Sequence, residues 1–161
     1  MRINLKLYSS KTLATASLLF AAVGVAHAAE SGFTNWGSVN VAGKGTTGVQ
    51  INSGITPANS RPGAWPAHYG AVKIDFDVPP GWLGLSVYGF KDGVMCDWYT
   101  EYSSFQTNKF SNTALRPLCS PNEDGTPSTY RTAIGGLVWN GTSEYHALGP
   151  QYSPSFNFPG Q

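Results

Sequence analysis

The sequence predicts an all-β chain that folds as a single antiparallel β-sandwich, jelly-roll-like in type, after a cleaved signal peptide. Three observations support this fold class. Gly, Pro, Ser, Thr and Asn interrupt the chain at short intervals, and apolar residues alternate with polar ones between the interruptions. No segment after the leader carries apolar residues at helical spacing. Short strands separated by turn residues are typical of sandwiches and barrels.

Residues 1–28 predict the signal peptide. Three basic side chains give the leader a positive charge, an apolar run follows, and the small-residue motif "AHA" ends directly before Ala29. The apolar run is shorter than the roughly 20 residues that a helix needs to cross a bilayer. We therefore expect a secreted domain of residues 29–161, extracellular or periplasmic, with no membrane span.

Charge excludes two classes of partner. Cleavage removes three of the ten Lys and Arg residues and none of the nine Asp and Glu residues, which leaves the mature chain slightly acidic. Nucleic acids and anionic membrane surfaces both require a basic patch. Neither is predicted as a partner. At this length a single domain with its own core is expected.

The two cysteines, Cys96 and Cys119, predict one disulfide. Export carries both thiols to an oxidising compartment, where a pair normally forms a bond. Closing a loop of this size stabilises a fold by about 3 kcal/mol in the chain-entropy model. A catalytic thiol is the alternative, and it is disfavoured because no local motif surrounds either residue.

Seven segments read as strands, and three as loops. The predicted strands are 36–42, 47–51, 71–78, 83–90, 94–102, 128–140 and 144–148. The predicted loops are 52–70, 103–127 and the proline-rich tail from Gly149. No internal repeat is present.

Two turns predict a three-stranded meander. Asp92-Gly93 is a strong signal for a two-residue type I′ hairpin, which places Val87 opposite Trp98. The motif "PPGW" at 79–82 fits a type II turn, which pairs the flanking strands 71–78 and 83–90.

The two turns agree on one apolar face for this meander. A slip of one residue in either hairpin would place charged residues among the apolar ones. The predicted inner face comprises Val72, Ile74, Phe76, Val78, Leu83, Leu85, Val87, Val94, Cys96 and Trp98.

The opposite face of the meander predicts the binding site. Small residues, Gly84 and Ser86, lie on its middle strand, with carboxylates and a tyrosine on either side. Aromatic rings cover the apolar C–H patches of a sugar, and ionised carboxylates accept hydrogen bonds from its hydroxyls. The candidate ligand-binding residues are Asp75, Asp77, Tyr88, Asp97, Tyr99 and Glu101. They predict a secreted recognition module for a glycan or cell-surface ligand.

Other interpretations of the same residues stay open. An antiparallel sheet ordinarily has one solvated face, on which polar residues need no function. Asp77 and Glu101 straddle Gly84 in the predicted register, at a spacing that suits an inverting polysaccharide-degrading enzyme. Aromatic residues in 52–70 and 103–127 would suit a protein-binding factor: a toxin component, an inhibitor or a surface-assembly subunit. A structural envelope protein is a further alternative.

The sequence predicts no cofactor and no metal site. Calcium is an alternative at Asp75 and Asp77 or in the oxygen-rich segment 121–128, but neither place has the ligand spacing of a known loop site. After the leader, only His68 and His146 remain, and neither lies at zinc-ligand spacing from another His or Cys. We expect His68 to lie in a packed loop beside Trp65 and Tyr69.

Overall fold

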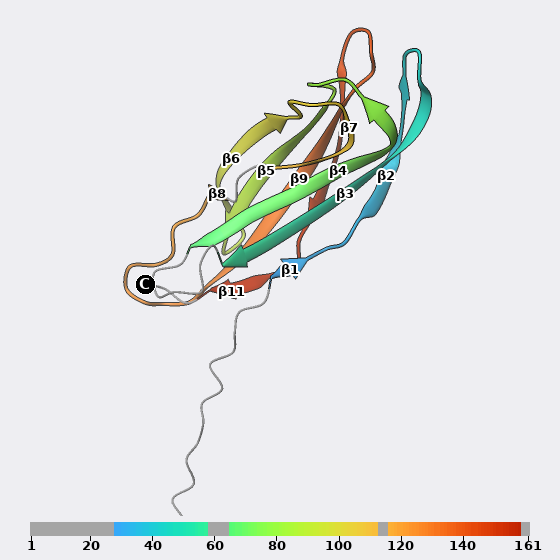
Figure 1. The fold of residues 1–161 in the computed structure, drawn as a ribbon. Helices are drawn as coiled ribbons and strands as arrows, with labels where there is room; N and C mark the ends of the chain where they lie inside the picture. The colour runs from blue at the N-terminus through green and yellow to red at the C-terminus, as the bar shows by residue number, and fades with distance from the viewer. Residues whose placement is uncertain (1–27, 58–64, 113–115, 159–161) are drawn as a thin grey trace, which may run out of the picture.

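The computed structural model describes residues 28–57, 65–112 and 116–158. Within these ranges the chain is all-β, and its strands form two antiparallel sheets that pack face to face, with β3 and β4 crossing β5 and β9 (Figure 1). The predicted β-sandwich is confirmed. The described part of the chain contains no helix of the length and apolarity needed to cross a membrane. The predicted leader, apart from Ala28, lies outside the described residues.

Sheet A has six strands, of which β3 and β4 are the long central pair. β1 and β2 pair along successive parts of β3, and β7 and β8 pair along β4. The strands are β1 (Ala29–Glu30), β2 (Thr34–Val41), β3 (Gly45–Pro57), β4 (Pro66–Val78), β7 (Thr107–Ser111) and β8 (Arg116–Pro117).

Sheet B has five strands in the order β10-β9-β5-β6, with β11 pairing along β9 beyond the end of β10. The strand β6 therefore forms one edge of the sheet. The strands are β5 (Leu83–Lys91), β6 (Val94–Tyr102), β9 (Ser128–Trp139), β10 (Tyr145–Tyr152) and β11 (Phe156–Phe158).

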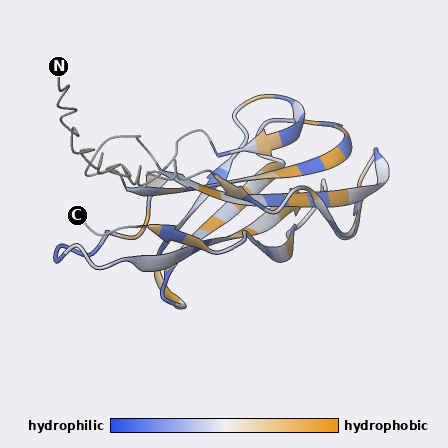
Figure 2. Cartoon of the chain, turned by 90° about the horizontal axis from the view of Figure 1, so that it is seen from below, coloured by the Kyte–Doolittle hydropathy of each residue, from blue (hydrophilic) through white to orange (hydrophobic). Residues whose placement is uncertain are grey.

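The core lies between the two sheets and is built from alternate residues of the strands. The alternation of hydrophobic and hydrophilic positions can be followed along the ribbon in Figure 2. Most of the predicted inner face is confirmed: Phe76 is half-buried and packs against the core, and the other six residues of β4 and β5 are buried. Those six are Val72, Ile74, Val78, Leu83, Leu85 and Val87.

The predicted pairing of β4 with β5 is wrong, because the two strands lie in different sheets. The turn between them is of the predicted kind: Gly81 has φ 80°, and the Trp82 amide donates to the Pro79 carbonyl over 3.2 Å. The chain passes from one sheet to the other at this turn. Both strands face the same core from opposite sides. The predicted inner residues of β4 and β5 are therefore correct although the predicted pairing is wrong.

The hairpin of β5 and β6 begins as predicted and then shifts by one residue. Asp92 and Gly93 have φ 50° and 82°, as a type I′ turn requires, and Lys91 lies opposite Val94. A bulge at Cys96 then places Trp98 opposite Tyr88.

Because successive strand residues point to opposite faces, the bulge turns the rest of β6 over. Trp98 was predicted to be in the core but is 54% exposed. Val94, predicted to face inward, is 70% exposed at the turn, and Cys96, predicted to face inward too, is also exposed.

The predicted disulfide is confirmed. Cys96 and Cys119 are bonded, with 5.5 Å between their Cα atoms. Gly89 makes this approach possible: a Cβ atom there would lie 2.6 Å from the Cβ of Leu118 and 3.2 Å from the sulfur of Cys119. The bulge lets the Cys96 side chain leave the regular ladder and reach its partner.

The strands extend into segments that were predicted to be loops. Residues 52–57 belong to β3 and residues 66–70 to β4. Polar side chains on these extensions are buried, among them Asn52, Ser53 and His68, and they hide the alternation that marks a strand. The strands β7 and β8 lie in the predicted middle loop, and β11 lies in the predicted tail.

Replacing Gly70 by alanine is expected to lower the free energy of unfolding by about 1–3 kcal/mol, the usual effect of overpacking. A Cβ at this position would lie 2.3 Å from Cγ1 of Ile134, which cannot move far inside the core. Gly135→Ala is the matched control, because its Cβ would meet neighbours only at 3.8 Å or more. Denaturant midpoints measure both effects; equal midpoints for the two variants would contradict this packing.

Removing the disulfide by Cys96→Ala with Cys119→Ala should lower the free energy of unfolding by about 3 kcal/mol, because the unfolded chain regains the freedom of the 23-residue separation. The buried Cys119 side chain adds a small packing loss. Wild-type protein unfolded in excess reductant serves as the comparison. A reduced protein as stable as the oxidised one would be the contrary result.

Candidate functional site

The structure does not bring the six predicted ligand-binding residues together. Asp75 and Asp77 are exposed on the outer side of β4 in sheet A, whereas Tyr88 lies on the outer side of β5 in sheet B. Asp75 ties β4 to β3, since its carboxylate accepts hydrogen bonds from the Gly48 amide over 2.8 Å and from the Thr47 hydroxyl over 3.1 Å. It has a structural role in this position.

The remaining three predicted residues lie on β6, away from the outer face. Tyr99 and Glu101 lie opposite Val87 and Leu85, on the inner side of the hairpin, and are half-buried. The Tyr99 side chain packs against the core, and its hydroxyl accepts a hydrogen bond from the Asn112 amide over 2.9 Å. Asp97 is exposed next to the bulge, where its carboxylate accepts a hydrogen bond from the Trp98 amide.

The predicted arrangement of the six residues on one face of a three-stranded meander is therefore wrong. It required β4 beside β5 and an unshifted β6, and neither condition holds. The carboxylate pair proposed for catalysis fails for the same reason, because Asp77 and Glu101 belong to different sheets. Of the six residues, only Tyr88 lies on the face described next.

Aromatic side chains gather instead on the outer face of sheet B, in two groups. The Trp98 group consists of Tyr88, Phe90, Trp98 and Tyr152, with Met95 beside it. In this group the rings of Tyr88 and Trp98 stack at 6.2 Å and 25°, and those of Phe90 and Tyr152 lie 6.0 Å apart. The Arg131 guanidinium lies 5.0 Å over the Tyr152 ring.

The Tyr102 group consists of Tyr102, Trp139 and Tyr145. The Tyr145 ring lies 5.2 Å from Tyr102 and 5.0 Å from Trp139. The Tyr145 hydroxyl donates to the Gly81 carbonyl. Burial, and then the neighbouring Tyr102, raise the pKa of Tyr145, so this hydroxyl keeps its proton.

Small residues form a floor between the two groups. Ser86 lies opposite Gly135 on one side and opposite Thr100 on the other, and the two hydroxyls are hydrogen-bonded at 2.8 Å. At Gly84 a Cβ atom would lie 2.6 Å from the Tyr102 ring, so the ring lies directly over the bare backbone. The floor consists of Gly84, Ser86 and Gly135.

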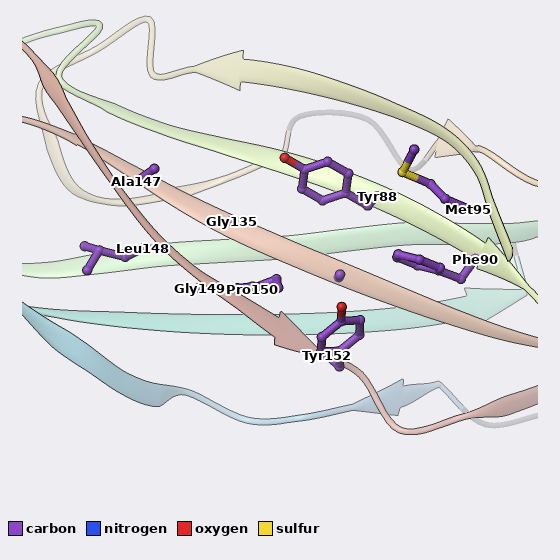
Figure 3. A pocket seen from close by; sticks show the side chains of 10 residues that line it. Tyr88, Phe90, Met95, Gly135, Ala147, Leu148, Gly149, Pro150 and Tyr152 are labelled. Atoms are coloured by element: carbon purple, nitrogen blue, oxygen red, sulfur yellow. The ribbon is translucent and has the colours of Figure 1, made fainter. Parts of the chain in front are cut away.

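Two cavities open on this face. The first has a volume of about 360 Å³, and its aromatic walls are Tyr88, Phe90 and Tyr152. Figure 3 shows Tyr88 and Tyr152 on opposite sides of β9, with Phe90 and Met95 at one end. The second, of about 320 Å³, is lined by Pro80, Gly81, Trp82, Trp139 and Tyr145. Among the residues that the structure describes, no Lys, Arg, His, Asp or Glu side chain lines either cavity.

Metal chemistry has little support in the described ranges. No three His, Cys, Asp or Glu side chains gather there in a way that would hold an ion. In the segment 121–128, the Asp124 carboxylate accepts hydrogen bonds from the Thr126 hydroxyl and amide, which close the turn and lower the pKa of Asp124. His146 lies 3.8 Å from Glu144 in an exposed pair.

His68 lies in the core, in a strand instead of the predicted packed loop. It is fully buried on β4, with Nδ1 2.9 Å from the Thr132 hydroxyl and no partner for Nε2. Burial disfavours the charged ring and lowers the pKa of His68 to about 4. His68 is therefore neutral near pH 7 and is not available to a ligand.

In comparisons with known proteins, no family model, curated protein or solved structure matches the chain. The candidate site therefore depends on its geometry. The sequence did not predict the principal residues of this site. The face on which they lie depends on the bulge at Cys96 and on the pairing of β10 with β9. Only the density of aromatic residues in 98–102 and 139–152 marks them in the sequence.

We expect acidification to destabilise the fold through His68. Its pKa is about 4 in the folded protein and about 6.5 in the unfolded chain, so only the unfolded chain binds a proton between these values. The stabilisation is complete above pH 6.5 and is lost as the pH falls to 4, by roughly 3 kcal/mol in total.

Denaturant unfolding at several pH values between 4 and 7 measures this loss. The variant His68→Gln removes the titrating ring and leaves every carboxylate in place. Its pH dependence should be flatter than that of the wild type, whatever its absolute stability. Parallel curves for the two proteins would show that His68 does not carry the effect.

Proposed function

We propose that this protein is a secreted recognition module that binds carbohydrate on the outer face of sheet B. One observation carries the proposal: two groups of partly exposed aromatic rings border a floor of small residues on a single face. Trp98, Tyr102, Tyr145 and Tyr152 are 54%, 46%, 38% and 42% exposed. Such rings offer flat apolar surfaces that match the C–H faces of sugars.

Hydroxyl groups on the same face favour a sugar over a purely apolar ligand. The half-buried Thr100 hydroxyl lies on the floor and is hydrogen-bonded to the hydroxyl of the buried Ser86. Tyr88 and Tyr152 add phenolic hydroxyls at the first cavity. A ligand with ring faces and hydroxyl edges would use both kinds of surface.

Secretion is supported by the predicted leader and by the disulfide. A disulfide persists in oxidising compartments and is rare in reducing ones. An extracellular or periplasmic site would also bring the aromatic face into contact with cell-wall or environmental polysaccharide.

A protein partner is a second candidate, favoured by exposed apolar side chains away from the aromatic face. Phe105 is 55% exposed in the connection after β6, and Trp65 is 37% exposed before β4. A toxin component, inhibitor or surface-assembly subunit would contact its partner through such residues. A pull-down that depends on Phe105 or Trp65, and not on Trp98, would favour this function.

Trp98→Ala is expected to weaken carbohydrate binding at least tenfold while the fold stays intact, because the exposed ring is a stacking surface and contributes little to the core. Trp65→Ala is the matched control, an exposed tryptophan outside the aromatic face, and should bind as the wild type does. Retardation in gels that contain cellulose, xylan, mannan, mixed-linkage glucan or pectin measures binding.

Two results would contradict the proposal. One is no retardation of the wild-type protein by any of these polysaccharides. The other is equal retardation of wild-type and Trp98→Ala protein, with circular dichroism showing that both are folded.

A further inference from the structure

The two aromatic groups lie in line along the strands of sheet B. Tyr88 and Gly84 are four residues apart on β5, which corresponds to about 13 Å along a strand. The Trp98 group surrounds Tyr88, and the Tyr102 ring lies over Gly84. This separation is longer than one sugar ring, so a single monosaccharide cannot contact both groups.

The residues between the two groups are small. Gly135 and Ser86 lie side by side in the middle row, and a Cβ atom at Gly135 would be 3.8 Å or more from its neighbours. A Cβ at Gly135 would therefore make ordinary van der Waals contacts without a clash. Nothing larger than a serine or threonine stands between the two groups in the row that joins β9, β5 and β6.

The charge of the lining limits the class of ligand. The described residues that line the first cavity, and those that line the second, carry no formal charge near neutral pH. A carboxylated or sulfated sugar would lose water there without gaining an ion pair, which is unfavourable. The Arg131 guanidinium lies over Tyr152, at the edge of the Trp98 group, with its Nε donating to the Ser153 carbonyl.

We infer that the ligand is a linear, uncharged glycan bound along its length, with the chain crossing the small-residue floor from the Trp98 group to the Tyr102 group. The inference rests on the proposed function and adds ligand class and binding mode to it. An internal stretch of polysaccharide satisfies both aromatic groups at once. A disaccharide can occupy only one of them.

Titration calorimetry with neutral oligosaccharides of two and six units tests the inference, using β-1,4-linked glucose, β-1,4-linked xylose and β-1,4-linked mannose. Oligogalacturonate of six units is the charged comparison. We expect a neutral hexasaccharide to bind at least tenfold more tightly than its disaccharide, and oligogalacturonate to bind more weakly than that hexasaccharide.

Three variants locate the chain on the surface. Trp98→Ala and Tyr102→Ala should each weaken hexasaccharide binding about tenfold, because each removes a stacking ring from one of the two aromatic groups. Gly135→Val fills the middle of the floor, where the added Cβ is tolerated by its neighbours. It should weaken the hexasaccharide much more than the disaccharide. Trp65→Ala should leave both affinities unchanged.

The outcomes distinguish a failure of the inference about ligand length and charge from a failure of the proposed carbohydrate binding. If the protein binds sugars and Trp98→Ala abolishes this, but the hexasaccharide gains nothing over the disaccharide, the inference fails and the proposed function stands. Tighter binding of oligogalacturonate, or an unaffected Gly135→Val hexasaccharide complex, also overturns the inference. If no sugar binds the wild-type protein in these assays or in the polysaccharide gels, both fail.

Discussion

The fold depends on a reciprocal contact between the two sheets, in which isoleucines of each sheet occupy the space above glycines of the other. Ile134 of sheet B packs against Gly70 of sheet A, where no Cβ atom fits, and Ile51 of sheet A packs against Gly136 of sheet B, where a Cβ would be tightly crowded. Large side chains over small ones let the sheets approach closely and exclude water. All four residues lie on the long central strands, so this contact also fixes how the sheets face each other.

The outer face of sheet B follows from this inner packing. With one side of β5 and β9 committed to the core, the alternate residues point outward, and these include Tyr88, Trp139 and the floor glycines Gly84 and Gly135. Adjacent glycines 135 and 136 thus face opposite sides of the sandwich: Gly136 leaves room for the core isoleucine Ile51, and Gly135 carries no side chain on the outer face. The candidate site and the core are two sides of the same strands.

Much of the fold could be predicted from the sequence, because strands, turns and disulfides have local signals. The inner residues of β4 and β5, both turn types and the bond between Cys96 and Cys119 follow from alternation, from positive φ requirements and from cysteine count. The choice of sheet for β4 has no such signal. A tight turn places Val78 and Leu83 on the inside whether the strands pair or cross between sheets, so the pattern fits both.

The candidate site was less predictable for two physical reasons. A single extra residue at Cys96 reverses which face each later residue of β6 points to. The hydrophobic pattern of β6 fits the strand with or without the bulge, because aromatic residues occur on both of its faces. The face also assembles Tyr145 and Tyr152 from a strand interrupted at Gly149 and Pro150, whose register with β9 no local motif reveals. Tyr88 was identified because its strand is buried on one side and has no bulge before it.

The bulge has a further consequence for how the molecule meets copies of itself. Strand β6 is an edge of sheet B, and its exposed Val94, Met95 and Trp98 would make it a ready template for another strand. A neighbour that pairs along β6 would encounter the irregular backbone at Cys96 and lose its register within a few residues. The disulfide ties this irregularity to Cys119, so the edge cannot straighten without breaking a covalent bond. We therefore expect the residue that turns Trp98 outward also to oppose the pairing of a second copy along β6.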